Sequence, residues 1–141
     1  MKNEVYKPYF TDVALYNSGK IGEDIYFVLD SKQGRIYAYT EDGILLYAFG
    51  VNGTQKGTFY SASAIDFIPE REGRPAQLVV TDAFKNTVTV LRETDFSKSV
   101  RKALSLYNDG DYKSAKTAWE GVKKTASGYL PADVSLAKME L

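Results

Sequence analysis

The feature that most constrains the fold of this chain is an internal repeat of 52 residues. Residues 28–30 end an apolar run at an aspartate, a four-residue turn follows, and residues 35–39 begin the next run. The same order returns at residues 80–82, a four-residue turn and residues 87–91. In each copy a strand ends at Asp, a Gly or Asn stands in the turn, and a second strand follows. A repeat of this period predicts a β-propeller or a solenoid.

Short apolar runs predict seven strands before residue 95. They lie near residues 11–16, 24–29, 35–40, 44–49, 63–68, 77–81 and 87–92. An Asp-Gly pair at residues 42–43 predicts a hairpin, because Gly accepts the positive φ that the turn requires. Residues 44–49 do not alternate between apolar and polar, which indicates burial on both faces of a sheet. No helix fits between this strand and the one before it. The chain is therefore expected to stack antiparallel sheets face to face.

After residue 95 the apolar residues are spaced by three and four, which predicts helices. The first helix is expected to start at an N-cap of Thr94 or Asp95 and to end at the Asn-Asp-Gly-Asp sequence of residues 108–111. The second begins there, and the third begins at Pro131. The predicted apolar stripes of the three helices are Phe96, Val100, Ala103, Leu104 and Tyr107; Tyr112, Ala115, Trp119 and Val122; and Leu130, Val134, Ala137 and Leu141. The fold class is mainly β plus α, with domains at residues 1–94 and 95–141.

Composition excludes several classes of function. The chain contains no Cys and no His, so disulfides, thiolate zinc sites and imidazole bases are excluded. Eighteen Lys and Arg balance eighteen Asp and Glu, and the basic residues are scattered, so no nucleic-acid partner is expected. No run approaches ~18 apolar residues, and no transmembrane segment is expected. The closely spaced carboxylates of a calcium loop are also missing from the sequence.

Residues 30–36, Asp-Ser-Lys-Gln-Gly-Arg-Ile, resemble the NHL-repeat signature of an aspartate, a Gly/Asn-rich turn, an arginine and an aliphatic residue. Residues 50–53 and 56–59 resemble the link between two NHL blades. The resemblance covers about residues 11–92 in two units, and Thr87 replaces the arginine in the second. It implies β-propeller blades, each a four-stranded antiparallel sheet.

The first blade would occupy residues 11–49, and the second, at residues 63–92, would lack its fourth strand. Two blades cannot close a ring, because propellers have typically four to eight. We expect the chain to be the C-terminal end of a longer propeller with an artificial Met1, or one of several two-blade chains that build a ring together. Open sheet edges favour the first. The polar insert at residues 69–75, with two prolines, is expected to be a surface hairpin.

The segment at residues 97–130 resembles a tetratricopeptide repeat (TPR). Ala103, Leu106, Gly110, Tyr112, Ala115, Trp119 and Val122 stand at the spacings of that motif. Ser127 stands near the place of the closing proline of the family. The resemblance implies an α-hairpin, with residues 131–141 as the first helix of another repeat. We expect Trp119 to fill the core between the helices.

Together these resemblances imply a non-catalytic protein-interaction scaffold, because NHL propellers and TPR helices are commonly binding platforms. The expected partner is a protein or peptide, and a homo-oligomer is expected if several chains build the ring. Some NHL–TPR chains look like extracytoplasmic parts of bacterial membrane-anchored proteins, which favours that location. No catalytic residue, cofactor or metal ligand is assigned.

Two alternatives remain open from the sequence. In the first, the chain would be a remnant of a metal-dependent propeller lyase, lactonase or hydrolase that uses the strand-end carboxylates Asp30 and Asp82. Their equivalent positions in the repeat favour a turn-capping role instead. Alternatively, exposed aromatic residues bind a sugar or a peptide. The candidate binding residues are Asp30, Arg35, Tyr37, Tyr39, Asp82 and Trp119.

Overall fold

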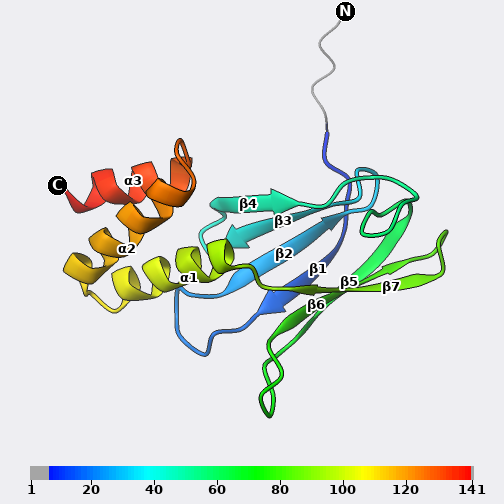
Figure 1. Cartoon of the computed structure of the whole chain (residues 1–141), viewed down its shortest axis with the longest axis horizontal. Helices are drawn as coiled ribbons and strands as arrows, with labels where there is room; N and C mark the ends of the chain where they lie inside the picture. The colour runs from blue at the N-terminus through cyan, green and yellow to red at the C-terminus, as the bar shows by residue number, and fades with distance from the viewer. Residues whose placement is uncertain (1–6, 141) are drawn as a thin grey trace, which may run out of the picture. The chain divides into compact units, whose positions relative to one another are not determined.

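The computed structural model describes residues 7–140, which form two antiparallel sheets and three helices (Figure 1). The first sheet has the order β1-β2-β3-β4 and the second β5-β6-β7. The strands are β1 (Phe10–Tyr16), β2 (Ile25–Asp30), β3 (Arg35–Thr40), β4 (Leu45–Phe49), β5 (Ala62–Ile68), β6 (Gln77–Asp82) and β7 (Thr87–Arg92). The helices are α1 (Asp95–Asn108), α2 (Tyr112–Thr125) and α3 (Leu130–Met139). The mixed class and the two antiparallel sheets are confirmed.

The core of the first sheet lies on one face of its central strands. Phe27 of β2 pairs with Ala38 of β3, and Leu29 pairs with Ile36. All four side chains are buried. Successive side chains of a strand point to opposite faces, so these two pairs share a face and form one apolar layer.

The two sheets pack against each other, with their first strands β1 and β5 side by side (Figure 1). The ring of Tyr16 meets the ring of Phe67 edge to face, with 5.3 Å between their centroids. Four residues earlier on β1, the Oδ2 atom of Asp12 accepts a hydrogen bond of 2.9 Å from the backbone N–H of Ile65. The second sheet therefore covers the face of the first sheet that carries the apolar layer.

Two hairpins expected from the sequence are confirmed. Gly43 has a φ of 78°, and its N–H donates to the carbonyl of Thr40, which closes the turn between β3 and β4. In the insert, Arg71 and Arg74 exchange two backbone hydrogen bonds, and the two residues between them have positive φ. This is a type I′ turn, whose twist matches that of its flanking strands. The insert extends between β5 and β6 as an exposed hairpin (Figure 1).

The helices begin and end at the predicted signals. Thr94 caps α1 by accepting from the N–H of Ser97, and Asp111 caps α2 by accepting from the N–H of Ser114. Between them Gly110 has a φ of 80°, the left-handed conformation that ends a helix at a glycine. Buried residues on the facing sides of α1 and α2 are Val100, Ala103, Ala115, Trp119 and Val122.

The apolar stripe predicted for the third helix is wrong. Leu130 and Val134 are exposed, and the buried residue of α3 is Ala132. The reason is tertiary: α3 packs on α2, and a small side chain allows the two backbones to approach. The ion pair between Lys123 and Asp133, at 2.8 Å, joins the same two helices, and this hydrogen bond raises the pKa of Lys123. Leu141, the last residue of the predicted stripe, and Met1 lie outside the described residues.

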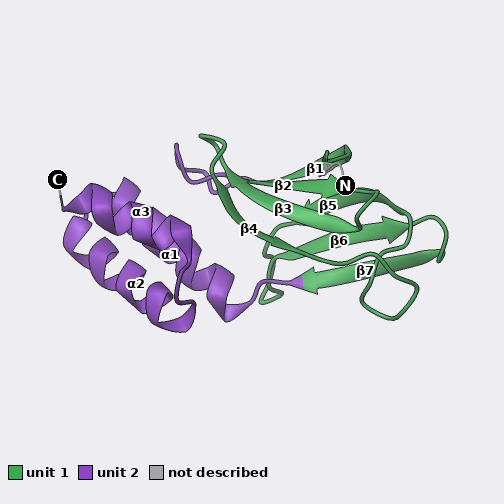
Figure 2. Ribbon diagram, turned by 90° about the horizontal axis from the view of Figure 1, so that it is seen from above, with its two compact units in different colours: residues 1–16, 25–91 green, residues 17–24, 92–141 purple. Residues whose placement is uncertain are grey.

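The chain forms two compact units (Figure 2). One contains both sheets, up to Leu91. The other contains the three helices together with the loop Asn17–Asp24, which joins β1 to β2. The side chain of Asn108 donates a hydrogen bond of 2.9 Å to the carbonyl of Gly22 in this loop. No helix in the described part of the chain is long and apolar enough to cross a membrane.

Candidate functional site

Asp30 is buried at the end of β2 and its carboxylate binds backbone N–H groups. The Oδ1 atom accepts from the N–H groups of Lys32 and Gln33, each at 3.0 Å, and so caps the turn between β2 and β3. The Oδ2 atom accepts from the N–H of Tyr9, at 3.2 Å, just before β1. One carboxylate thus joins the turn to the start of the sheet.

Asp82 does the same in the second sheet. Its Oδ1 atom accepts from Phe84 at 3.1 Å and Lys85 at 3.0 Å, and its Oδ2 atom accepts from Tyr60 at 2.7 Å and Ser61 at 3.1 Å. Burial by itself raises the pKa of this carboxyl, but the four backbone N–H groups outweigh it and hold the pKa below its usual value. Both aspartates therefore have the turn-capping role that the repeat predicts, and they are not exposed to a ligand.

The repeat extends beyond the aspartates to other hydrogen bonds and irregularities at the same 52-residue offset. The hydroxyl of Thr11 donates to the carbonyl of Leu29, and the hydroxyl of Ser63 donates to that of Thr81. Each hydroxyl belongs to the residue at which its strand departs from regular pairing, between Phe10 and Asp12 and between Ala62 and Ala64. Gly34 and Asn86 have φ values of 60° and 51°. The three strands of the second sheet therefore repeat the first three strands of the first sheet.

Tyr37 and Tyr39 lie on the face of the first sheet that points away from the second. Their rings stack with 6.5 Å between centroids, and Phe10 meets Tyr37 edge to face at 5.7 Å. Both tyrosines are half-buried. Arg35 is also half-buried and begins β3 on the same face, opposite Asp30.

The tyrosines belong to a larger apolar surface, which we call outer face 1. Two rows of paired residues cross β1, β2 and β3 here. The rows are Val13, Val28 and Tyr37, and Leu15, Tyr26 and Tyr39. The residues on β1 are exposed, and those on β2 and β3 are half-buried. Outer face 1 is uncharged along both rows.

The second sheet has a corresponding surface, which we call outer face 2. On β5 and β6 it consists of Ala64, Asp66, Ile68, Gln77, Val79 and Thr81. The 52-residue repeat places Val88 and Val90 of β7 on the same face, so the surface is mainly apolar, with Asp66 as its charged residue. The buried residues Leu78 and Val80 lie on the opposite face of the sheet, toward the first sheet. Val88 and Val90 are both more than half exposed on β7, the outer strand of this sheet. No pattern in the sequence alone distinguishes this face from a covered one.

Trp119 is almost completely buried between α1 and α2, so its ring is not available to a ligand. Its Nε1 atom is buried without a hydrogen-bond partner in the described part of the chain. The core position predicted for this residue is the one observed.

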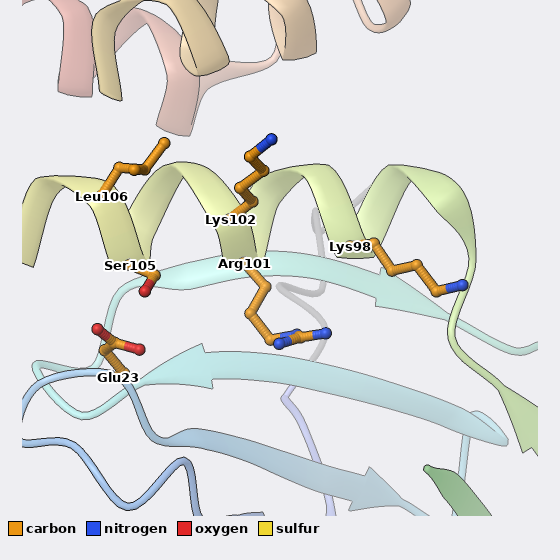
Figure 3. A pocket seen from close by; sticks show the side chains of 6 residues that line it. All are labelled: Glu23, Lys98, Arg101, Lys102, Ser105 and Leu106. Carbon is orange, nitrogen blue, oxygen red and sulfur yellow. The ribbon is translucent and has the colours of Figure 1, made fainter. Parts of the chain in front are cut away.

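A shallow hollow of about 270 Å³ lies beside α1, within the helical unit (Figure 3). It is lined by Glu23, Lys98, Arg101, Lys102, Ser105 and Leu106. Arg101 is held by Glu93, with Nε and a terminal nitrogen donating to the two carboxylate oxygens at 3.0 and 3.1 Å. Lys98 and Lys102 are exposed on the helix surface. Residues 7–140 contain no group of three or more His, Cys, Asp or Glu that could hold a metal ion.

Comparisons with models of known protein families and with curated proteins find no match for this chain.

Proposed function

We propose that this chain is a non-catalytic protein-interaction scaffold, built from two NHL-like propeller blades and a TPR-like helical segment. The observation that carries the proposal is a difference between equivalent positions of the repeat. Ile36 and Ala38 are 0% exposed on β3, whose outer edge is closed by β4. Their equivalents Val88 and Val90 are 64% and 51% exposed. Outer face 2 therefore has the composition of an interface without a cover.

Equivalent residues on the first strands of the two sheets, β1 and β5, also differ in exposure. Val13 is 52% exposed on outer face 1, whereas its equivalent Ile65 is 5% exposed against the first sheet. Contiguous apolar surfaces of this kind mark sites of protein interaction in soluble proteins. Tyrosines such as those of outer face 1 are enriched at the centres of protein interfaces, since they bring a large apolar ring together with a polar group.

The enzyme alternative has less support. The carboxylate oxygens of Asp30 and Asp82 accept hydrogen bonds from backbone N–H groups, and neither carboxylate is exposed. A metal or a substrate could reach these oxygens only after the turns had opened. A carboxylate so engaged is a structural element of the repeat.

The test is a photo-reactive amino acid placed on each outer face of the full chain in its native host. Val13 and Val88 are replaced separately, and Lys116, exposed on α2, is the matched control. Proteins attached at the faces are identified, and their binding to the purified wild-type, Val13→Glu and Val88→Glu chains is then titrated.

The proposal requires a protein that attaches at an outer face and not at the control. Its affinity for the chain should fall at least about tenfold when a charge enters the apolar face. It is overturned if neither face attaches protein above the control, or if every attached protein binds both charged-face variants, Val13→Glu and Val88→Glu, as tightly as the wild type.

A further inference from the structure

The contact between the two sheets of one chain can be repeated between two chains, because each sheet has a second face that is exposed. We propose that outer face 2 of one copy docks on outer face 1 of another copy of the same chain, head to tail. This inference rests on the proposed scaffold function and names the partner of its exposed faces.

The repeat shows that the two outer faces correspond to the two halves of the existing interface. Moving along the chain by 52 residues converts the covered layer of the first sheet, which is Phe27, Leu29, Ile36 and Ala38, into Val79, Thr81, Val88 and Val90 of outer face 2. Moving back by 52 residues converts Ile65, Phe67, Leu78 and Val80 of the second sheet into Val13, Leu15, Tyr26 and Val28 of outer face 1. A head-to-tail contact between copies therefore repeats a contact that each chain already makes within itself.

The contacts between the sheets translate into specific pairs. The ring pair of Tyr16 and Phe67 becomes Ile68 facing Leu15 of the next copy. The contact of Asp12 with Ile65 becomes Ala64 facing Val13 of the next copy. These four residues are exposed, and none carries a charge. Each predicted pair joins two apolar side chains.

Asp66 is the charged residue in the middle of the corresponding stretch of β5. Its Oδ1 atom accepts from the N–H of Phe67 at 2.8 Å, as that of Asp12 accepts from Val13 at 2.9 Å. Asp12 uses its second oxygen to bind a backbone N–H of the neighbouring sheet. By the repeat, however, Asp66 stands at the position of Ala14, which is buried in the contact within the chain. In the contact between copies its carboxylate therefore lies beside the β1 backbone of the next copy, near Leu15. The contact requires that its second oxygen accept a backbone N–H there, as that of Asp12 does within the chain.

The sizes of the side chains on the two outer faces compensate each other. Outer face 2 has Val79 and Thr81 where the covered layer has Phe27 and Leu29, so it is the flatter of the two surfaces. Outer face 1 is the fuller surface, because Tyr26 stands where the second sheet has Leu78, and Tyr37 and Tyr39 stand at the positions of Thr89 and Leu91. Interface cores are packed as densely as protein interiors, so larger side chains on one face can fill the space left by smaller side chains on the other. This complementarity favours a second copy over an unrelated protein.

A head-to-tail contact uses two different surfaces, so it continues until a ring closes or a filament forms. Propellers typically contain four to eight sheets, so a closed ring takes about two to four copies of a two-sheet chain.

The experiment uses the natural lack of cysteine in this chain. Leu15→Cys and Ile68→Cys variants are mixed and treated with a short bis-maleimide. The inference predicts a cross-linked dimer in the mixture, at least tenfold above each variant alone and above a mixture of Leu15→Cys with Lys116→Cys. Equal yields in all of these samples would overturn it.

Charge variants give a second readout that does not depend on cross-linking. Val13→Glu blocks outer face 1 and Val88→Glu blocks outer face 2, and both positions are exposed, so both variants should fold. Each variant alone is expected to be a monomer, and an equal mixture should form a one-to-one dimer through the two intact faces, as seen by native mass spectrometry. If the mixture stays monomeric, or if one variant dimerises with itself, the head-to-tail contact is wrong. Proteins other than this chain attached at the outer faces would then leave the scaffold proposal in place, whereas their absence would end both proposals.

Discussion

Replacement of Asp82 by Asn tests whether this carboxylate holds the second sheet together. The carboxylate accepts four backbone hydrogen bonds, two on each oxygen. Asn keeps one oxygen for two of these donors and turns an NH2 group toward the other two. A buried donor that loses its acceptor costs about 1–3 kcal/mol, so two lost acceptors should destabilise the sheet by roughly 2–6 kcal/mol.

The assay is urea unfolding followed by far-ultraviolet circular dichroism, with Asp42→Asn as the control. Asp42 is exposed in the hairpin turn, and its substitution should change the free energy of unfolding by less than about 0.5 kcal/mol. Amide hydrogen exchange adds a local readout, because the N–H groups of Tyr60, Ser61, Phe84 and Lys85 should exchange faster in Asp82→Asn.

The lowered pKa of Asp82 also predicts how the difference in unfolding free energy between wild type and Asp82→Asn depends on pH. The pKa of Asp82 is lowered in the folded protein, so its stabilisation is fully present above the unfolded pKa and disappears as the pH falls through the folded value. The gap between wild type and Asp82→Asn should be constant above about pH 5 and shrink below about pH 4. A loss below about 1 kcal/mol at neutral pH would refute the capping role. A rise of Tm with calcium that disappears in Asp82→Asn would instead favour the metal-dependent enzyme alternative.

Five further substitutions, at four positions, test packing and surface contacts by chemical unfolding. A Cβ atom on Gly34 would lie 2.6 Å from the backbone oxygen of Phe59 at a positive φ, so Gly34→Ala should cost roughly 3 kcal/mol. Gly43→Ala, with positive φ but no atom within 4 Å, should cost only about 1 kcal/mol, and equal losses would contradict this. Trp119→Phe removes a buried N–H that has no acceptor among residues 7–140, so it should cost about 1 kcal/mol or less. Trp119→Ala should cost about 3–5 kcal/mol, and similar losses in the two variants would argue against an unpaired Nε1. Lys20→Ala breaks an exposed ion pair of 3.3 Å and should change stability by less than about 0.5 kcal/mol, and a larger loss would show that this pair fixes the loop.

The strands and the first two helices were predictable from the sequence because their signals are local. The Asp-Gly pair at residues 42–43 and the glycine at position 110 fix turns through their own backbone conformations. The 52-residue repeat then placed Asp30 and Asp82 in one structural role. Local chemistry and internal similarity were sufficient for these features.

Two features depend on distant contacts and could not be predicted in this way. The buried side of α3 is set by α2, so its apolar spacing placed Leu130 and Val134 wrongly in a core. The loop Asn17–Asp24 groups with the helices through Asn108 and its neighbour, which lie more than 80 residues away along the chain. The repeat locates the residues of both outer faces, but only the structure shows which of these residues are exposed within residues 7–140.

The central claim is that outer face 1 and outer face 2 bind each other in different copies of this chain. The mass of the wild-type chain in solution tests it most directly. Light scattering behind a sizing column, over a range of concentrations, should give a discrete multiple of 15.7 kDa that Val88→Glu reduces to the monomer. A wild-type chain that stays at 15.7 kDa at every concentration would contradict the head-to-tail contact.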